Sequence, residues 1–375
     1  MYLIIIVLIF LIIANFLTKK SKPVFIVTLA FMWFLMTFTT GNADHAIYES
    51  RFENPSLWKN SSEILFELLI NLCRIAGMSY VQYKALLCIV ILTLIGSTIW
   101  KLNSYPNIVL ILYFICPFAL NSAQLRWAAA SSILIFGYRY LINDHSARVG
   151  SKKRNITAND IRYIVCVILA TLTHTAAVFG LLLLLAKKIG VKSSMIWTIV
   201  FNVFFLFIFT PANIQGIMNR IGAGARIGAY FSTEYQQSEY RHVGWALLLV
   251  LITAAVVIIG CLLIQRWNKK NGYKDVNVEY LLKSNILMLS IVALIIRYTG
   301  EMYRPQEAML VFDYILLMNS VTKKNQILSN KLSYRNFFVQ LDVFSLAIGS
   351  CFAKSILSVF ETIWVPIFTQ NILFK

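Results

Sequence analysis

Long apolar runs separated by short polar connections fill most of the chain. A helix needs about 20 apolar residues to cross a bilayer, and a segment within lipid must satisfy its backbone hydrogen bonds internally. The runs that meet or approach this length are residues 2–18, 24–39, 81–100, 107–120, 123–142, 194–210, 243–265, 278–298, 306–320 and 338–360. The pattern predicts an all-α polytopic membrane protein with about 10–12 transmembrane helices.

The run at residues 161–187 fits no simple span. It is apolar but interrupted at Thr173, His174 and Thr175, too long for one span and too short for two full ones. Two interpretations remain open. The run forms either one tilted helix or a re-entrant pair of half-helices that meet at His174.

Lysine-rich connections indicate which helix ends face the cytoplasm. Such groups follow residues 18, 142, 187, 265 and 320. By the positive-inside rule these connections are cytoplasmic. They all fall on one side only if the run 161–187 enters and leaves by the same face or forms two short spans, which favours the re-entrant pair. The N-terminus is then outside, together with the long outer-face loops 40–80 and 211–242.

Composition supports a membrane protein and excludes several other classes. The chain is 59% hydrophobic, so we expect residues 1–375 to form a single integral membrane domain. The formal net charge of +18 predicts contact with anionic membrane lipid, because no soluble segment is long enough to bind nucleic acid. The cysteines lack metal-site spacing and are expected to be small buried hydrophobes. GxSxG and HExxH motifs are absent, which argues against a hydrolase or a protease.

The outer connections carry arginine where the cytoplasmic ones carry lysine. Their basic residues include Arg51, Arg74, Arg220, Arg226, Arg241 and Arg304, against the single lysine Lys59. The planar guanidinium matches phosphate oxygens with two parallel hydrogen bonds and keeps its charge. The outer face is therefore predicted to hold phosphate or pyrophosphate.

Arg126 lies inside an apolar run, near Gln124 and Asn121. An arginine near the centre of a spanning segment costs roughly 2.5–3.5 kcal/mol on insertion scales. One interpretation is that its side chain reaches the lipid headgroups. The other is a fixed cation that faces a cavity where an anionic group docks.

The first outer loop combines an acid with aromatic and basic residues. Asp44 is followed by Tyr48 and Arg51, and an amphipathic segment follows at residues 61–77. This is either a solvated loop with an interfacial anchor helix or a wall that binds a sugar. In the second case Asp44 is a candidate base or substrate ligand, and Tyr48 stacks on a sugar ring.

His174 interrupts the apolar run 161–187. A lone histidine there is either a hydrogen-bonded core residue or a neutral base that accepts a proton. No second histidine is spaced to form a metal pair with it.

Further candidates lie in the later outer connections. Arg220 and Arg226 flank a glycine-containing turn, which is either an anion cradle or a flexible lid. Arg297 precedes Tyr298, and it binds substrate or forms an i,i+4 ion pair with Glu301. The candidate catalytic residues are Arg126, His174 and Asp44, and the candidate substrate-binding residues are Tyr48, Arg51, Gln124, Arg220, Arg226, Arg241, Arg297, Tyr298 and Arg304.

Several short motifs follow one another along the chain. They are N-x-D-x-x-x-Y-x-x-x-F at 42–52, Glu63 and Phe66, N-x-x-x-L-R at 121–126, L-A-T-x-x-H-T-A-A at 169–177, and Y-R-P at 303–305. In this order they resemble the EpsG-like family of bacterial Wzy-type polysaccharide polymerases, and WVPIF near the C-terminus is also similar. The family commonly has Arg-Gln where this chain has Arg126-Trp127.

The resemblance implies an enzyme that polymerises repeat units of an exopolysaccharide, capsule or O-antigen on the outer face of the bacterial inner (plasma) membrane. Its substrate is expected to be an oligosaccharide on undecaprenyl pyrophosphate. A chain-length regulator is an expected partner, and neither a cofactor nor a metal is expected.

The residues agree with a metal-independent membrane glycosyltransferase. Transfer from a lipid pyrophosphate needs positive charge at the leaving group and a base for the acceptor hydroxyl. Arg126, Arg297 and Arg304 can supply the charge, and Asp44 or His174 the base. The outer loops are expected to hold the acceptor.

Three other functions remain open. A non-polymerising glycosyltransferase or ligase on the same lipid carrier shares these features. A flippase of lipid-linked oligosaccharide fits less well, because the arginines gather on one side and no internal repeat is apparent. A membrane O-acyltransferase depends on His174 alone.

Overall fold

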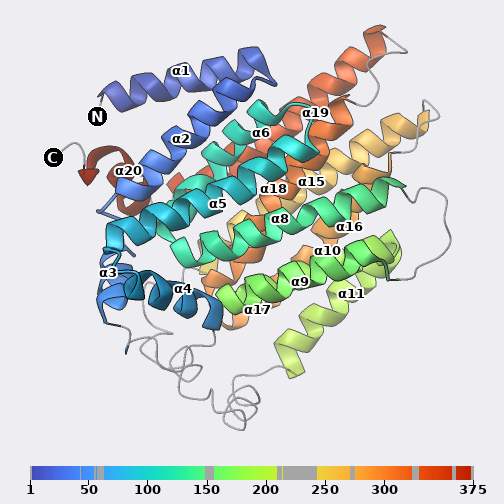
Figure 1. Cartoon of the computed structure of the whole chain (residues 1–375). Helices are drawn as coiled ribbons and strands as arrows, with labels where there is room; N and C mark the ends of the chain where they lie inside the picture. Colours follow the sequence, from blue (N-terminus) through green and yellow to red (C-terminus); the bar gives the residue numbers. More distant parts are fainter. Residues whose placement is uncertain are drawn as a thin grey trace.

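The computed structural model of the chain is a bundle of helices (Figure 1). It describes residues 2–42, 44–54, 56, 63–147, 156–208, 213, 243–270, 275–322, 329–356 and 360–372. Regular structure in these residues is helical apart from one isolated β-bridge, between Thr39 and Asn371. The predicted all-α fold is confirmed.

Helices cover almost all described residues of the apolar runs. In the first half they are α1 (Tyr2–Thr18), α2 (Lys22–Phe38), α5 (Tyr80–Leu102), α6 (Pro106–Tyr113) with η2 (Phe114–Phe118) and α7 (Ala119–Ala123), and α8 (Leu125–Ala147). In the second half they are α11 (Val191–Val203) with η4 (Phe204–Ile208), α15 (Val243–Lys270), α16 (Val276–Met288) with η6 (Leu289–Ile291) and α17 (Val292–Arg297), α18 (Arg304–Thr322), and α19 (Ser329–Ser350) with η8 (Cys351–Ile356). Among the described segments, 6 are long and apolar enough to cross a membrane, and α1 and α2 are shorter apolar helices.

The run 161–187 forms a helical hairpin. Helix α9 (Ala158–Thr173) ends at an extended residue, His174, and η3 (Thr175–Gly180) and α10 (Leu181–Lys188) lead back. In the last turn of α10, Lys187 and Lys188 donate to the carboxylate of Asp160 in the first turn of α9, at 2.6 and 2.5 Å. The hairpin therefore begins and ends at the same end of the bundle, which excludes one tilted helix and fits either a re-entrant pair or two short spans.

The described lysine-bearing turns gather at this end. Asn107 N donates to the carbonyl of Lys19, which joins the turn after α1 to the start of α6. Asn319 Nδ2 donates to the carbonyl of Leu102, which joins the last turns of α5 and α18. Arg335 of α19 bonds the carbonyl of Ser320 and lies 3.6 Å from Asp275, just before α16. We call this the lysine end.

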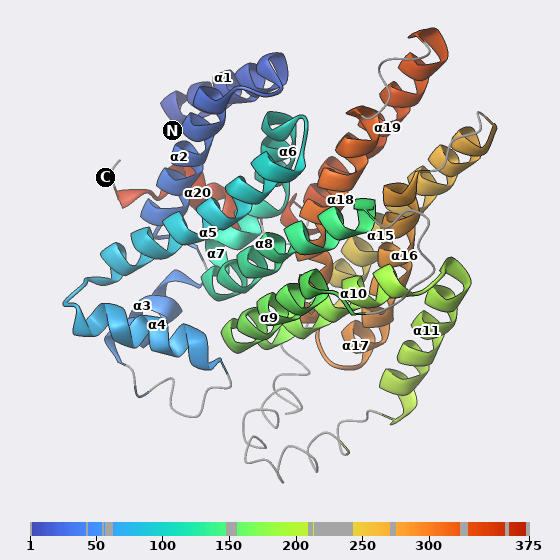
Figure 2. The same cartoon turned by 45° about the vertical axis from the view of Figure 1, so that its right-hand side comes forward.

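Two short helices, α3 (His45–Glu53) and α4 (Ile64–Ile75), lie at the opposite end of the bundle, as do η7 (Gly300–Tyr303) and the C-terminal segment with η9 (Phe360–Trp364) and α20 (Val365–Thr369) (Figures 1 and 2). Helix α4 buries Phe66 and Ile70 and exposes Leu68 and Leu72. This pattern agrees with the helix predicted to lie in the interface over residues 61–77.

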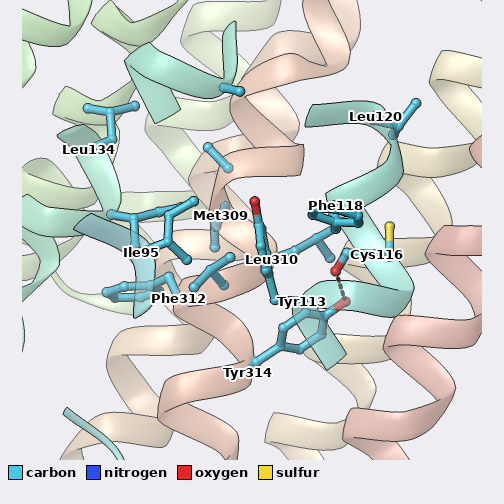
Figure 3. Packing of buried hydrophobic residues seen from close by; sticks show 14 of the residues in the cluster. Ile95, Tyr113, Cys116, Phe118, Leu120, Leu134, Met309, Leu310, Phe312 and Tyr314 are labelled. Atoms are coloured by element: carbon cyan, nitrogen blue, oxygen red, sulfur yellow. Dashed lines mark hydrogen bonds between the residues drawn. The ribbon is translucent and has the colours of Figure 1, made fainter. Parts of the chain in front are cut away.

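The centre of the bundle is the broken helix α6–α7. It is almost wholly buried, whereas α11 at the edge is almost wholly exposed. The backbone leaves helical geometry at Cys116 and Pro117, because proline lacks the N–H that a continuous helix needs. The carbonyl of Cys116 accepts a hydrogen bond of 3.1 Å from the hydroxyl of Tyr314 on α18 (Figure 3). All six cysteines of the chain are buried and form no disulfide, as the sequence predicted.

Candidate functional site

A cluster of polar side chains lies at the end of the bundle opposite the lysine end. It is drawn together from the loop before α3, the start of α4, the α7–α8 junction, the turn of the α9–α10 hairpin, and η7 with the start of α18. We call it the arginine cluster, and its members are Asp44, Tyr48, Glu63, Gln124, Arg126, His174, Glu301, Tyr303 and Arg304.

Arg126 is held by a buried acid. The backbone leaves helical geometry at Gln124, which separates α7 from α8 and places Arg126 in the first turn of α8. Its Nη1 lies 2.5 Å from Oε2 of Glu63, whose side chain is 2% exposed. Its backbone N–H, one of the donors that a helix start leaves open, bonds to the hydroxyl of Tyr48 at 3.4 Å. Arg126 is thus a fixed cation with a protein partner; the docking of an anion stays a prediction.

Arg304 joins three segments. Its Nη1 lies 2.9 Å from Nε2 of His174, and its Nε donates to Oε1 of Gln124 at 3.3 Å. Its Nη2 forms an ion pair with Glu301. Gln124 in turn donates to the hydroxyl of Tyr303 at 3.1 Å. The first turn of α18 is thereby fixed to the α7–α8 junction and to the hairpin.

His174 accepts a hydrogen bond from Arg304 and thereby positions the guanidinium. A guanidinium only donates, so Nε2 of His174 must carry a lone pair, and the imidazole is neutral in this contact. Nδ1 lies 3.2 Å from the backbone N of Ala176. The Ala176 N–H and the Arg304 guanidinium thus point at different ring nitrogens, but a neutral imidazole has only one nitrogen with a lone pair. We assign that lone pair to Nε2, because its contact with Arg304 is shorter and charge-assisted. The ring of Trp127 packs edge-on against the imidazole, with the ring centroids 5.3 Å apart.

Asp44 lies within electrostatic reach of both arginines. It is partly buried just before α3, and burial raises the pKa of its carboxyl above the ordinary 3.8 because the charged form is poorly solvated there. The positive charges of Arg304 and Arg126 oppose this rise in pKa, and the negative charge of Glu301 adds to it. An acid of this kind is a suitable proton acceptor beside an anion site.

The loop before α3 is held by the C-terminal segment. Thr40 N donates to the carbonyl of Gln370 at 3.0 Å, and Thr39 and Asn371 form the isolated antiparallel bridge. From the first turns of α5, Nζ of buried Lys84 donates to the carbonyl of Thr39 at 2.6 Å. These contacts fix the segment that precedes Asp44.

Other candidates from the sequence lie outside the arginine cluster. Arg51 on α3 acts on Asp44 through its charge. Tyr298 is buried and packs beside Leu294. Arg297 is exposed at the end of α17, and its described contacts include no member of the cluster. Arg220, Arg226 and Arg241 lie outside the described residues.

Three members of the cluster were not among the candidates. Glu63 was noted only as a motif residue on a helix face, although it is the partner of Arg126. The suggested i,i+4 pair of Glu301 with Arg297 is wrong, because Glu301 pairs with Arg304. The i,i+3 spacing of these two residues was a signal for that pair. No signal in the sequence placed Tyr303 beside Gln124.

The described residues hold no group of three or more histidine, cysteine, aspartate or glutamate side chains arranged to bind a metal. The sequence itself contains no spacing that suggests one.

Comparison with known proteins identifies the family. The model of the EpsG family matches residues 22–352, a range that contains every member of the arginine cluster. No curated protein and no solved structure matches the chain. Helix α1 and the C-terminal contacts on the loop before α3 lie outside the matched range. The chain belongs to the EpsG family of membrane proteins, a family linked to exopolysaccharide biosynthesis.

Proposed function

We propose that this protein is a polysaccharide polymerase that joins oligosaccharide repeat units carried on undecaprenyl pyrophosphate. The observation that supports this most directly is the convergence of Arg126 and Arg304 with Asp44 at one end of the bundle. Two guanidiniums from different helices suit a ligand with two linked phosphates, and a nearby acid suits deprotonation of a sugar hydroxyl.

In the proposed reaction an acceptor hydroxyl attacks the anomeric carbon of the donor sugar. The new glycosidic bond forms as the bond from that carbon to the pyrophosphate oxygen breaks. The leaving group takes the electron pair, and Arg126 and Arg304 stabilise the charge that develops on it. Asp44 takes the proton of the acceptor hydroxyl. The two arginines supply the positive charge, so we propose a metal-independent transfer.

We propose that His174 positions Arg304, and that Asp44 acts as the base. The lone pair of Nε2 faces a permanent cation, so protonation of His174 would place two donors against each other. Asp44 faces the same cations with the opposite charge, and its raised pKa makes it a better proton acceptor than an ordinary exposed aspartate.

The segregation of lysines supports the proposed orientation. The described lysine-bearing turns lie at the end opposite the arginine cluster, and the positive-inside rule assigns that end to the cytoplasm. The cluster and the N-terminus are then outside, in the bacterial plasma membrane. A separate chain-length regulator remains an expectation from the family resemblance.

The test is the glycan profile of a strain that lacks this chain, with lipid-linked intermediates separated by size. Loss of long polymer with accumulation of single complete repeat units on the outer face supports the polymerase. An incomplete repeat unit indicates a glycosyltransferase, and a complete unit retained on the inner face indicates a flippase. Complementation with wild type should restore the polymer, and complementation with Arg126→Lys at equal expression should not.

A further inference from the structure

Both arginines of the cluster are occupied by acids. Arg126 pairs with Glu63 and Arg304 pairs with Glu301. Under the proposed function, on which this inference rests, carboxylates lie where the phosphates of the substrate would dock. Any anion that binds Nη1 of Arg126 must therefore displace the Glu63 carboxylate.

The acids differ in how they reach their partners. Glu301 is three residues before Arg304 and is partly exposed, so this pair is local. Glu63 immediately precedes α4, is 63 residues from Arg126 in the sequence, and is 2% exposed. A buried acid brought to an arginine from another element is a competitor built into the fold.

The N-terminus of α4 offers the Glu63 carboxylate an alternative partner to Arg126. Glu63 is the residue that precedes α4, and in this structure its side chain makes no capping hydrogen bond to that helix. The first-turn N–H groups of a helix and its dipole stabilise a carboxylate at this position. The start of α4 is therefore a second environment that stabilises the carboxylate after it leaves Arg126.

Competition of this kind selects between anions. The leaflet around the site contains phospholipids with one phosphodiester and one negative charge, which an open guanidinium would also bind. A lipid pyrophosphate carries two linked phosphates and can contact both arginines together. The free energy needed to displace the buried carboxylate is the same for either ligand. Only the ligand with more charge and two contact points forms interactions that offset it.

We propose that Glu63 is a specificity-determining residue, which occupies Arg126 until a ligand with two linked phosphates displaces it. Phospholipids with a single phosphate are thereby excluded from the site. Glu63 does not touch the reacting atoms. It acts by setting which anions reach Arg126.

The test measures binding of inorganic pyrophosphate to the purified protein in nanodiscs of phosphatidylcholine, with and without phosphatidylglycerol. We expect Glu63→Gln to bind pyrophosphate about ten-fold more tightly in pure phosphatidylcholine, since the competing charge is gone. We expect phosphatidylglycerol to weaken that binding for Glu63→Gln but not for wild type. Glu67→Gln is the matched control, because it makes the same charge change one turn further along α4 and should behave as wild type.

Two results would overturn the inference. Weaker or unchanged pyrophosphate binding by Glu63→Gln shows that Glu63 only orients Arg126. Tighter binding that phosphatidylglycerol leaves unaffected shows that Glu63 does not exclude phospholipid. If Glu63→Gln does not fold, Glu63→Asp replaces it, because the shorter side chain draws the carboxylate away from Arg126; tighter binding is again expected, and unchanged binding again refutes the proposal.

Failure of the proposed function is distinguishable from failure of this inference. A chain that shows the expected pyrophosphate selectivity but whose loss leaves long polymer intact is not the polymerase, and the role of Glu63 stands. A chain whose loss abolishes polymer, but whose Glu63→Gln variant gains no affinity, is the polymerase without this selectivity.

Discussion

Replacement of Arg304 by lysine tests the central contact of the site. The guanidinium of Arg304 reaches His174, Gln124 and Glu301 with three different nitrogens. A lysine has one compact ammonium and can keep about one of these contacts. Loss of two charge-assisted hydrogen bonds, at about 1.5 kcal/mol each, removes about 3 kcal/mol of the free energy that holds the cationic group in place. We therefore expect the rate of polymer formation to fall roughly 100-fold.

The assay is incorporation of labelled repeat units into long polymer by membranes with equal amounts of each variant. Arg74→Lys is the matched control, because Arg74 lies in the last turn of α4 and its described contacts do not include the arginine cluster. His174→Gln offers an acceptor to Arg304 but no ionisable ring, so it should retain much of the activity, whereas His174→Leu should lose it. Near wild-type activity of Arg304→Lys, or complete loss in His174→Gln, refutes this account of the contact.

Two further predictions concern acids. Asp44 acts as a base only when deprotonated, and its pKa is raised, so the rate should begin to fall with decreasing pH at values above the ordinary pKa of 3.8. Asp44→Asn should lose activity at every pH. A wild-type pH–rate profile that rises towards acid contradicts the assignment. Asp160→Asn removes the buried acid that binds Lys187 and Lys188, which should lower the free energy of unfolding by about 3–5 kcal/mol. Thermal unfolding in detergent measures it against Asn159→Ala, and equal stability contradicts the prediction.

The helices were predictable from the sequence because lipid leaves the backbone few alternatives. The ends of α1 and α5 lie within a few residues of the runs predicted from hydropathy alone. The hairpin was predictable only as one of two alternatives. The contact of Asp160 with the lysines of α10 decides between them, and no local pattern reveals that contact.

The chemistry-bearing residues were easier to find than their partners. Arg126 and His174 stood out because ionisable side chains are rare in apolar runs. The pairing of Arg126 with Glu63 depends on how α4 packs on the bundle, and that packing has no signature in the sequence of either segment. The same holds for Gln370, which bonds the loop before α3 from the far end of the chain.

The burial of all six cysteines makes the wild-type protein ready for chemical mapping of its two faces. A water-soluble maleimide modifies thiols that it can reach, and the native thiols are enclosed. A single cysteine introduced at exposed Glu53, the last residue of α3, or at exposed Lys101, in the last turn of α5, is then the reactive group. Labelling of intact cells reads out which end of the bundle meets the medium, without first engineering away any native residue.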